Sequence, residues 1–298
     1  STALAPGLIA KARALHAERH YDLFHFHFPD PLTHLASALL PAEVPRVVTW
    51  HSDIVRQKAF LPLYAPWLRR FVQQVDAVIV SSPSMLQSSP FIARVAPARR
   101  HVIPCGLDYR HFLASEAQRR AADLRLSLGV AGPLVLAVGR LVYYKGYEFL
   151  IEAIAGLAEA NLIIIGRGPL KRRLRGQAQA LGCEKRVHLL QVDDDETLAA
   201  WYHACDVFCL PSVEPAETFG LVQLEAMACG KPVVSTRLGT GVEFVNQDGV
   251  TGIVVPPRDV DALRAALRRL LDDAQLRQSM GNAGRARAIE SFSKEDMA

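Results

Sequence analysis

The sequence predicts an α/β protein built from two doubly wound parallel sheets. Short apolar runs of strand length alternate with segments of helical periodicity along the chain, a pattern typical of parallel sheets with helices on both faces. The run over 133–139 is almost wholly apolar, as expected for a strand that is buried on both faces. Glycines and charged residues follow several of these runs, at the strand ends where open α/β sheets bind ligands.

The first part of the chain alternates strand and helix patterns up to about residue 104. The expected elements are an amphipathic helix over 7–20, a strand over 21–28 ended by Pro29, a helix over 32–40, a strand over 46–50, a helical segment over 54–75 interrupted by Pro62 and Pro66, and strands over 77–81 and 101–104. This is a small set for a doubly wound domain.

The second part repeats the alternation with more elements. The expected elements are a polar helix over 116–126, strands over 133–139, 161–166, 186–192, 206–210, 231–236 and 252–255, and helices over 146–158, from 170, over 195–204, from about 221 to Gly230, and over 260–271 with further helical sequence to 290. We place the domain boundary between residues 112 and 113. This gives an incomplete Rossmann-like N-terminal domain over 1–112 and a ligand-binding Rossmann-like domain over 113–298.

Composition excludes several classes of protein. The chain has 298 residues, a net charge of +4 and a pI near 8.9, with basic residues in small scattered groups, which argues against a nucleic-acid partner. Its five cysteines form no CxxC pair, as expected for reduced thiols in the cytoplasm. No apolar run approaches the roughly 20 residues of a membrane span. GxSxG, HExxH and a full GxGxxG are absent, which disfavours serine hydrolases, zincins and nicotinamide enzymes.

The stretch over 211–232 carries the most specific pattern in the chain. Glu217 and Glu225 flank Phe219, Gly220 and Leu221 at the expected start of a helix. The free N–H groups and the positive dipole end of such a start attract phosphate, while the two carboxylates can hold sugar hydroxyls. The alternative is a buried crossover helix with incidental acids.

Two cations follow the apolar strand over 133–139. Arg140 comes directly after Gly139, and Lys145 opens the next helix, so both side chains can converge on one anion. Gly166 and Gly168 occupy a second strand-to-helix turn, where glycine lets the backbone approach a ligand closely. The alternatives are two solvated cations and an ordinary turn. Gly239-Thr240-Gly241 is expected to be a turn, and the alternative places Gly239 and Thr240 near the ligand.

Histidines near two strand ends leave several interpretations open. His51 and Asp53 follow the strand over 46–50 and could form an acid–base pair, while Asp22, His25 and His27 could bind a metal. Histidines that bind the backbone are the alternative, and no metal site is predicted.

The segment over 55–72 interleaves aromatic and basic side chains. Its aromatic members are Phe60, Tyr64, Trp67 and Phe71, and its basic members are Arg56, Lys58, Arg69 and Arg70. Such a helix can lie on anionic lipid headgroups, or it can pack on its own sheet.

Taken together, these patterns resemble the retaining glycosyltransferases of family 4, which have the GT-B fold of two Rossmann-like domains facing across a cleft. The resemblance covers nearly the whole chain and is most specific over 139–146, 166–169, 211–232 and 249–257. The stretch over 51–58 looks most like bacterial enzymes of surface-polysaccharide synthesis, including mannosyltransferases. The family's N-terminal Gly-rich loop has no counterpart here, so the chain looks truncated at that end.

The resemblance implies a role for each matching position. Arg140 and Lys145 would bind the donor diphosphate, together with the N–H groups around Phe219, Gly220 and Leu221. Glu217 would contact the donor sugar, Glu225 the ribose, and His51 the transferred sugar. Gly139, Gly166 and Gly168 would line the donor site, and neither metal nor cofactor is expected.

The implied reaction is transfer of a hexosyl group, mannosyl or glucosyl, from a GDP- or UDP-linked donor to a glycan or lipid-linked glycan. The protein would be cytoplasmic, with a possible peripheral position on the inner face of the membrane. Two alternatives stay open. One is a nucleotide-sugar-binding remnant without catalysis, and the other is a different GT-B enzyme such as a nucleotide-sugar epimerase.

Overall fold

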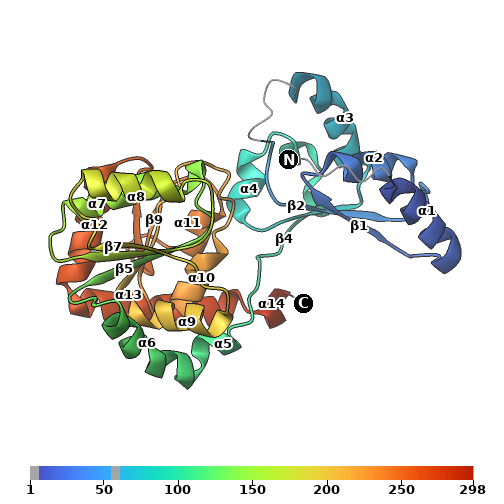
Figure 1. The fold of residues 1–298 in the computed structure, drawn as a ribbon. Helices are drawn as coiled ribbons and strands as arrows, with labels where there is room; N and C mark the ends of the chain where they lie inside the picture. The colour runs from blue at the N-terminus through green and yellow to red at the C-terminus, as the bar shows by residue number, and fades with distance from the viewer. Residues whose placement is uncertain (1–6, 55–60, 298) are drawn as a thin grey trace. The chain divides into compact units, whose positions relative to one another are not determined.

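The chain divides into two units, Ser1–Pro104 and Cys105–Ala298 (Figure 1). The computed structural model describes residues 7–54 and 61–297. Residues 105–112, which the sequence placed with the N-terminal domain, belong to the second unit. Tyr109 and Phe112 are buried in the core of that unit, so the chain leaves the first unit several residues before the expected boundary.

The first unit is built on a four-stranded parallel sheet of order β1-β2-β3-β4. Its elements are α1 (Leu8–Arg19), β1 (Phe24–Phe28), α2 (Pro31–Leu39), β2 (Arg46–Trp50), α3 (Leu61–Gln74), β3 (Ala77–Val80), α4 (Pro83–Ser88), two 3-10 turns (Ile92–Arg94 and Pro97–Arg99) and β4 (Arg100–Val102). Strand β1 starts three residues later than predicted, at Phe24. The expected helix over 54–75 is described from Leu61, and Pro66 lies inside it without ending it.

Alternation along β1 and β2 separates a core face from a polar face. Phe26, Phe28 and Trp50 point into the core of the first unit, whereas His25 and His27 point to the other face and are exposed. Helix α1 was expected to be amphipathic, but none of its residues is buried. The sheet of this unit therefore carries its histidines on the side opposite its apolar core.

The second unit is built on a six-stranded parallel sheet of order β10-β9-β8-β5-β6-β7. Its strands are β5 (Leu134–Val138), β6 (Asn161–Ile165), β7 (Val187–Leu190), β8 (Val207–Leu210), β9 (Val233–Thr236) and β10 (Gly252–Val255). Its helices are α5 (Arg110–Leu113), α6 (Ser115–Ser127), a 3-10 turn (Tyr143–Lys145), α7 (Tyr147–Ala155), α8 (Lys171–Ala180), α9 (Asp195–Ala204), α10 (Leu221–Ala228), α11 (Gly241–Val245), α12 (Val260–Asp272), α13 (Ala274–Ser291) and α14 (Lys294–Met297).

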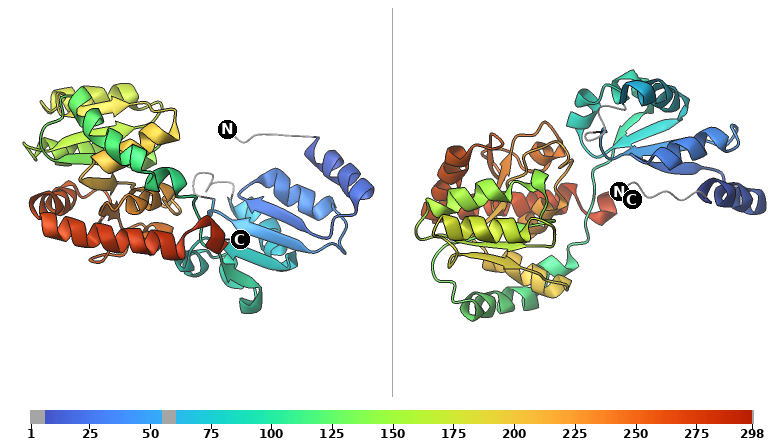
Figure 2. Two further views of the ribbon diagram at one scale, coloured as in Figure 1. Left: turned by 90° about the horizontal axis from the view of Figure 1, so that it is seen from below. Right: turned by 45° about the horizontal axis from the view of Figure 1, so that its top comes forward.

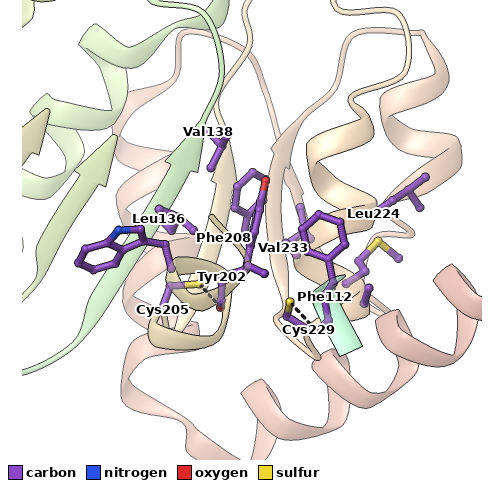
Figure 3. Close-up of a cluster of buried hydrophobic side chains, with 14 of the residues drawn as sticks. Phe112, Leu136, Val138, Tyr202, Cys205, Phe208, Leu224, Cys229 and Val233 are labelled. Carbon is purple, nitrogen blue, oxygen red and sulfur yellow. Dashed lines mark hydrogen bonds between the residues drawn. The ribbon is translucent and has the colours of Figure 1, made fainter. Parts of the chain in front are cut away.

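Helices cover both faces of this sheet, as predicted. One core lies under α7, α8 and α12, and the other lies under α6, α9 and α10. Figure 3 shows the second of these cores, where Tyr202 and Phe208 pack beside Cys205, and the Cys229 thiol donates to the carbonyl oxygen of Phe112. Helices α10 and α13 pack together; α13 is the long red helix in the left view of Figure 2.

The strand order contains a topological switch between β5 and β8. The chain runs outward from β5 to β6 and β7, then returns to the other side of β5 and continues through β8, β9 and β10. The helices that follow β5 and β8 therefore lie on opposite faces of the sheet, and sheets of this kind bind ligands outside the carboxyl ends of the strands at such a point. This position is where the sequence places Gly139, Lys145 and Glu217.

The segment Gly239-Thr240-Gly241, expected to be a turn, starts α11 through a capping box in which Thr240 and Glu243 satisfy each other's backbone N–H groups.

Within the residues that the structure describes, no helix combines the length and apolar character needed to cross a bilayer.

Candidate functional site

The loops after β5 and β8 contact each other directly. The N–H of Val213 donates to the carbonyl oxygen of Tyr144 over 2.8 Å. Gly146 adopts a left-handed conformation (φ 66°), and a side chain there would collide with the carbonyl oxygen of Pro211. Glycine at 146 therefore lets the turn that holds Lys145 approach the end of β8.

A buried ion pair joins these two loops. The Lys145 ammonium lies 2.6 Å from Oε2 of Glu217, and the two side chains are only 9% and 10% exposed. Ser212 donates its hydroxyl hydrogen to the same carboxylate oxygen over 2.8 Å. Thr240 donates its own to the backbone carbonyl of Glu217 over 2.8 Å. Ser212 and Lys145 hold the carboxylate and Thr240 holds the backbone of the same residue, so Glu217 is oriented before any ligand arrives.

The two predicted cations thus lie in different surroundings. Lys145 is buried against Glu217, whereas Arg140 is exposed at the turn after β5. The sequence predicted that both could bind one anion, but it did not predict that Lys145 already has an acidic partner. An arriving anion must therefore compete with Glu217 for the ammonium.

The glycines of the two strand ends bring their loops together. A side chain at Gly166 (φ 158°) would collide with the carbonyl oxygen of Gly139. A side chain at Gly168 would meet the backbone of Leu141. The N–H of Leu141 donates to the carbonyl oxygen of Arg167 over 2.8 Å. Gly166 and Gly168 therefore have a packing reason to be glycine, independent of any ligand.

The start of α10 presents unpaired backbone N–H groups. Gly220 caps the helix in a left-handed conformation (φ 73°), and the Phe219 side chain is buried against Phe292. In the described part of the chain, no acceptor lies on the N–H groups of Phe219, Gly220 or Leu221. The sequence expected this helix start to bind an anion, and the structure leaves its N–H groups available for one.

Glu225 lies within α10 and is held by a phenol. Tyr202, fully buried in α9, donates its hydroxyl hydrogen to Oε2 of Glu225 over 2.5 Å. Burial raises the pKa of Glu225, and the hydrogen bond from Tyr202 opposes that rise. Tyr202 therefore fixes the direction of the carboxylate that the sequence assigned to a ribose.

The histidines of the first unit form a stacked row. The His27 and His51 rings stack with centroids 5.2 Å apart, and His27 Nδ1 is hydrogen-bonded to His51 Nε2 over 2.9 Å. The His25 ring stacks on His27 in turn, at 4.8 Å. Burial lowers the pKa of His51, followed by the charges of His27 and His25.

The pairing of His51 with Asp53 considered from the sequence is wrong. Asp53 instead accepts hydrogen bonds from the Trp50 indole and the Ser89 hydroxyl, at 2.9 and 2.8 Å. Among the described residues there is also no group of three or more His, Cys, Asp and Glu side chains that could hold a metal ion.

Two residues of the site, Tyr147 and Tyr202, were not singled out from the sequence. Tyr147 lies close to Arg140 and Lys145 in the chain, and its hydroxyl was a usable signal. Tyr202 holds Glu225 of another element, and only the fold reveals that contact. His27, Ser212 and Thr240 lie in segments that were singled out, but their contacts with His51 and Glu217 appear only in the fold.

Family profiles match both parts of the chain. The profile described as "Glycosyl transferases group 1" matches residues 126–287, and the profile described as "Glycosyltransferase Family 4" matches residues 2–111.

Similar proteins include bacterial enzymes with curated names. The D-rhamnosyltransferase WbpZ of Pseudomonas aeruginosa is 36% identical over 98% of this chain and 74% of its own length. The O-antigen chain mannosyltransferase C of Escherichia coli is 34% identical over 93% and 73%. Among solved structures, sucrose-phosphate synthase from Thermosynechococcus elongatus is similar with a TM-score of 0.81 and 30% identity; the match spans 98% of this chain and 75% of the synthase chain. Anabaena HepE in complex with UDP is similar with a TM-score of 0.82 and 26% identity; the match spans 97% of this chain and 79% of the HepE chain.

Proposed function

The chain belongs to the glycosyl transferases group 1 family and is a glycosyltransferase of the GT-B type, and we propose that it transfers a hexosyl group from a nucleotide-diphosphate sugar with retention of configuration. The observation that best supports this proposal is the direct contact between the loop after β5 and the loop after β8. There, Lys145, Glu217 and the open N–H groups of α10 meet at the switch point of the sheet.

The donor site would divide its work among these groups. The diphosphate would lie on the N–H groups of Phe219, Gly220 and Leu221, with Arg140 and Lys145 supplying positive charge. Glu225, held by Tyr202, would accept hydrogen bonds from the ribose hydroxyls. Glu217 would bind hydroxyls of the donor sugar, and we expect His51 to act on the same sugar.

The transfer step needs stabilisation of the leaving group. The bond between the anomeric carbon and the diphosphate oxygen breaks, and a bond to an acceptor oxygen forms on the same face. The acceptor's proton passes to the leaving phosphate. Negative charge grows on the diphosphate as the bond breaks, and preorganised N–H groups and cations stabilise it most in the transition state. We expect no metal to be required, because these groups already supply the positive charge.

The names of the relatives support a proposal for the donor and the acceptor. Two of them are named for transfer of D-rhamnosyl and mannosyl groups, one to an O-antigen chain. A third, from Mycolicibacterium smegmatis, is named as GDP-mannose-dependent, whereas HepE is described in complexes with UDP and UDP-glucose. We therefore propose a GDP- or UDP-linked donor, with a mannosyl or related hexosyl group favoured. The proposed acceptor is a growing or lipid-linked glycan.

A thermal-shift panel tests the donor proposal. The protein is mixed in turn with GDP-, UDP-, ADP- and dTDP-linked sugars and with the free diphosphates. We expect the nucleotides of one base to raise the Tm of the protein, because a ligand that binds only the folded state stabilises that state. The Glu225→Ala variant should lose most of this shift. No shift with any member of the panel would contradict the donor site.

A further inference from the structure

Tyr147 is a buried residue whose hydroxyl makes no hydrogen bond to the described part of the fold. It opens α7, directly after the turn that holds Lys145, and is 1% exposed. Its hydroxyl has no hydrogen-bond partner among the residues that the structure describes. Buried hydroxyls are normally paired, and leaving one unpaired destabilises the folded state. Phenylalanine would fill the same space without this penalty, so the hydroxyl calls for an explanation outside the packing.

The hydroxyl converges with the Lys145 ammonium at the end of β5. A Cβ atom built on Gly139 would lie 2.9 Å from the Tyr147 oxygen and 3.2 Å from Lys145 Nζ. Both polar atoms therefore lie on the same side of Gly139. Lys145 has three N–H donors, and among the described residues its acceptor is the Glu217 carboxylate. Donors and an unpaired acceptor thus lie close together in a buried space.

The Lys145 ammonium would have different partners in the free protein and in the donor-bound protein. Without a ligand, Glu217 holds the ammonium at 2.6 Å. A diphosphate in the donor site would draw the ammonium away from Glu217, which is then needed for the sugar. An ammonium that leaves one buried partner needs a second group to keep its direction.

We propose that the Tyr147 hydroxyl is this second group: it accepts a hydrogen bond from the Lys145 ammonium in the donor-bound state and keeps Lys145 directed at the diphosphate. Tyr147 is thus a positioning residue for Lys145, and the inference rests on the proposed donor site. The phenol remains protonated throughout, because burial and then the Glu217 carboxylate raise its pKa well above the usual value. Its lone pairs accept the hydrogen bond from Lys145 while its own hydrogen stays in place.

Isothermal titration of the Tyr147→Phe variant with GDP and UDP tests this role. We expect the nucleotide that binds the unaltered protein to bind this variant about tenfold more weakly, since one hydrogen bond to a charged group is lost. The Tm without nucleotide should stay the same or rise, because an unpaired hydroxyl has been removed. A Tyr109→Phe control removes a buried hydroxyl that does have a partner, the carbonyl oxygen of Phe292 at 2.9 Å. That control should lower the Tm and leave nucleotide affinity unchanged.

A double-mutant cycle separates positioning from packing. In a Lys145→Ala background, Tyr147→Phe should change nucleotide affinity by less than about twofold, because its partner is gone. Equal losses in both backgrounds would overturn the inference, as would a Tyr147→Phe variant that binds nucleotide as well as the unaltered protein. A large drop in Tm on Tyr147→Phe would also overturn it. Failure of the unaltered protein to bind either nucleotide would instead refute the proposed donor site itself.

Discussion

Among single residues, the buried pair of Lys145 and Glu217 stabilises the fold and, in the proposed function, also binds the donor. Each side chain neutralises the other in a space that water barely reaches. Removing one member leaves an uncompensated buried charge, which usually costs about 3–5 kcal/mol. In the proposed function, the donor diphosphate would compete with Glu217 for the Lys145 ammonium.

Lys145→Ala should therefore lower both stability and turnover. We expect the free energy of unfolding to fall by roughly 3 kcal/mol, and turnover to fall by about a hundredfold or more. Urea denaturation and a donor-consumption assay measure the two effects. The double variant Lys145→Ala/Glu217→Ala should recover part of the stability without recovering activity, because the orphaned carboxylate is gone. Equal stability of the single and double variants would contradict the coupling.

Glu225 gives a pH-dependent prediction. Its pKa is raised mainly by burial, so the folded state holds the proton more tightly than the unfolded state. The stability that this proton contributes is full below the ordinary pKa of a glutamate and is lost as the pH rises through the raised value.

The variant Glu225→Gln removes this titration and keeps an oxygen for the Tyr202 hydroxyl. We expect it to gain stability relative to the unaltered protein as the pH rises from 4 to 7, while nucleotide binding falls. Urea denaturation at several pH values measures the difference between the two proteins. A difference that does not change with pH would count against a buried, titrating Glu225.

At the scale of elements, the strands of the second unit were the most predictable part of the molecule. The strand over 252–255 and the helix over 195–204 agree with the structure to the residue, because both apolar pattern and flanking signals are strong there. Helix α11 was missed because five residues are too few to show a helical period. The contacts of Lys145 with Glu217 and of Tyr202 with Glu225 could not be predicted, because each joins different elements of the fold.

The two ends of α10 allow a matched test of its N-terminal glycine. Gly220 and Gly230 both have left-handed backbones (φ 73° and 70°). A Cβ at Gly220 would come within 2.6 Å of Leu210 and 2.7 Å of Gln223, whereas a Cβ at Gly230 would meet nothing within 4 Å. Gly230→Ala should therefore carry only the backbone strain of about 1–2 kcal/mol.

Gly220→Ala should show the same strain, a further loss of stability from the collision, and a loss of nucleotide affinity, because the helix start must shift. Thermal unfolding and nucleotide titration of both variants measure this difference. If the two variants behaved alike, the start of α10 would have no special tie to the ligand.

At the scale of the whole molecule, the remaining question is whether the protein acts at a membrane surface. The sequence suggested a basic aromatic helix over 55–72, of which residues 55–60, including Arg56, Lys58 and Phe60, lie outside the described part of the chain. Within α3, Phe71 is a core residue and Tyr64 bonds to His34. Those two aromatic side chains are thus committed to the fold, and they cannot serve a lipid surface.

Other side chains of α3 are exposed and could contact a membrane surface. Leu63 and Trp67 lie one helical turn apart and are 80% and 65% exposed, and Arg70 is exposed on the same side of the helix, three residues after Trp67. An exposed apolar ridge next to an arginine can insert at an anionic headgroup layer. The proposed lipid-linked acceptor would give such a contact a purpose.

Co-sedimentation with vesicles of anionic and of zwitterionic lipid tests this contact. We expect binding to anionic vesicles that weakens as salt is raised, since surface charges are screened. Trp67→Ala should weaken it further through the lost apolar insertion. Leu126→Ala is the matched control, because Leu126 is 78% exposed on α6 of the second unit and the sequence has no aromatic residue between Phe112 and Tyr143. Equal effects of the two substitutions, or binding that ignores salt, would assign α3 to folding alone.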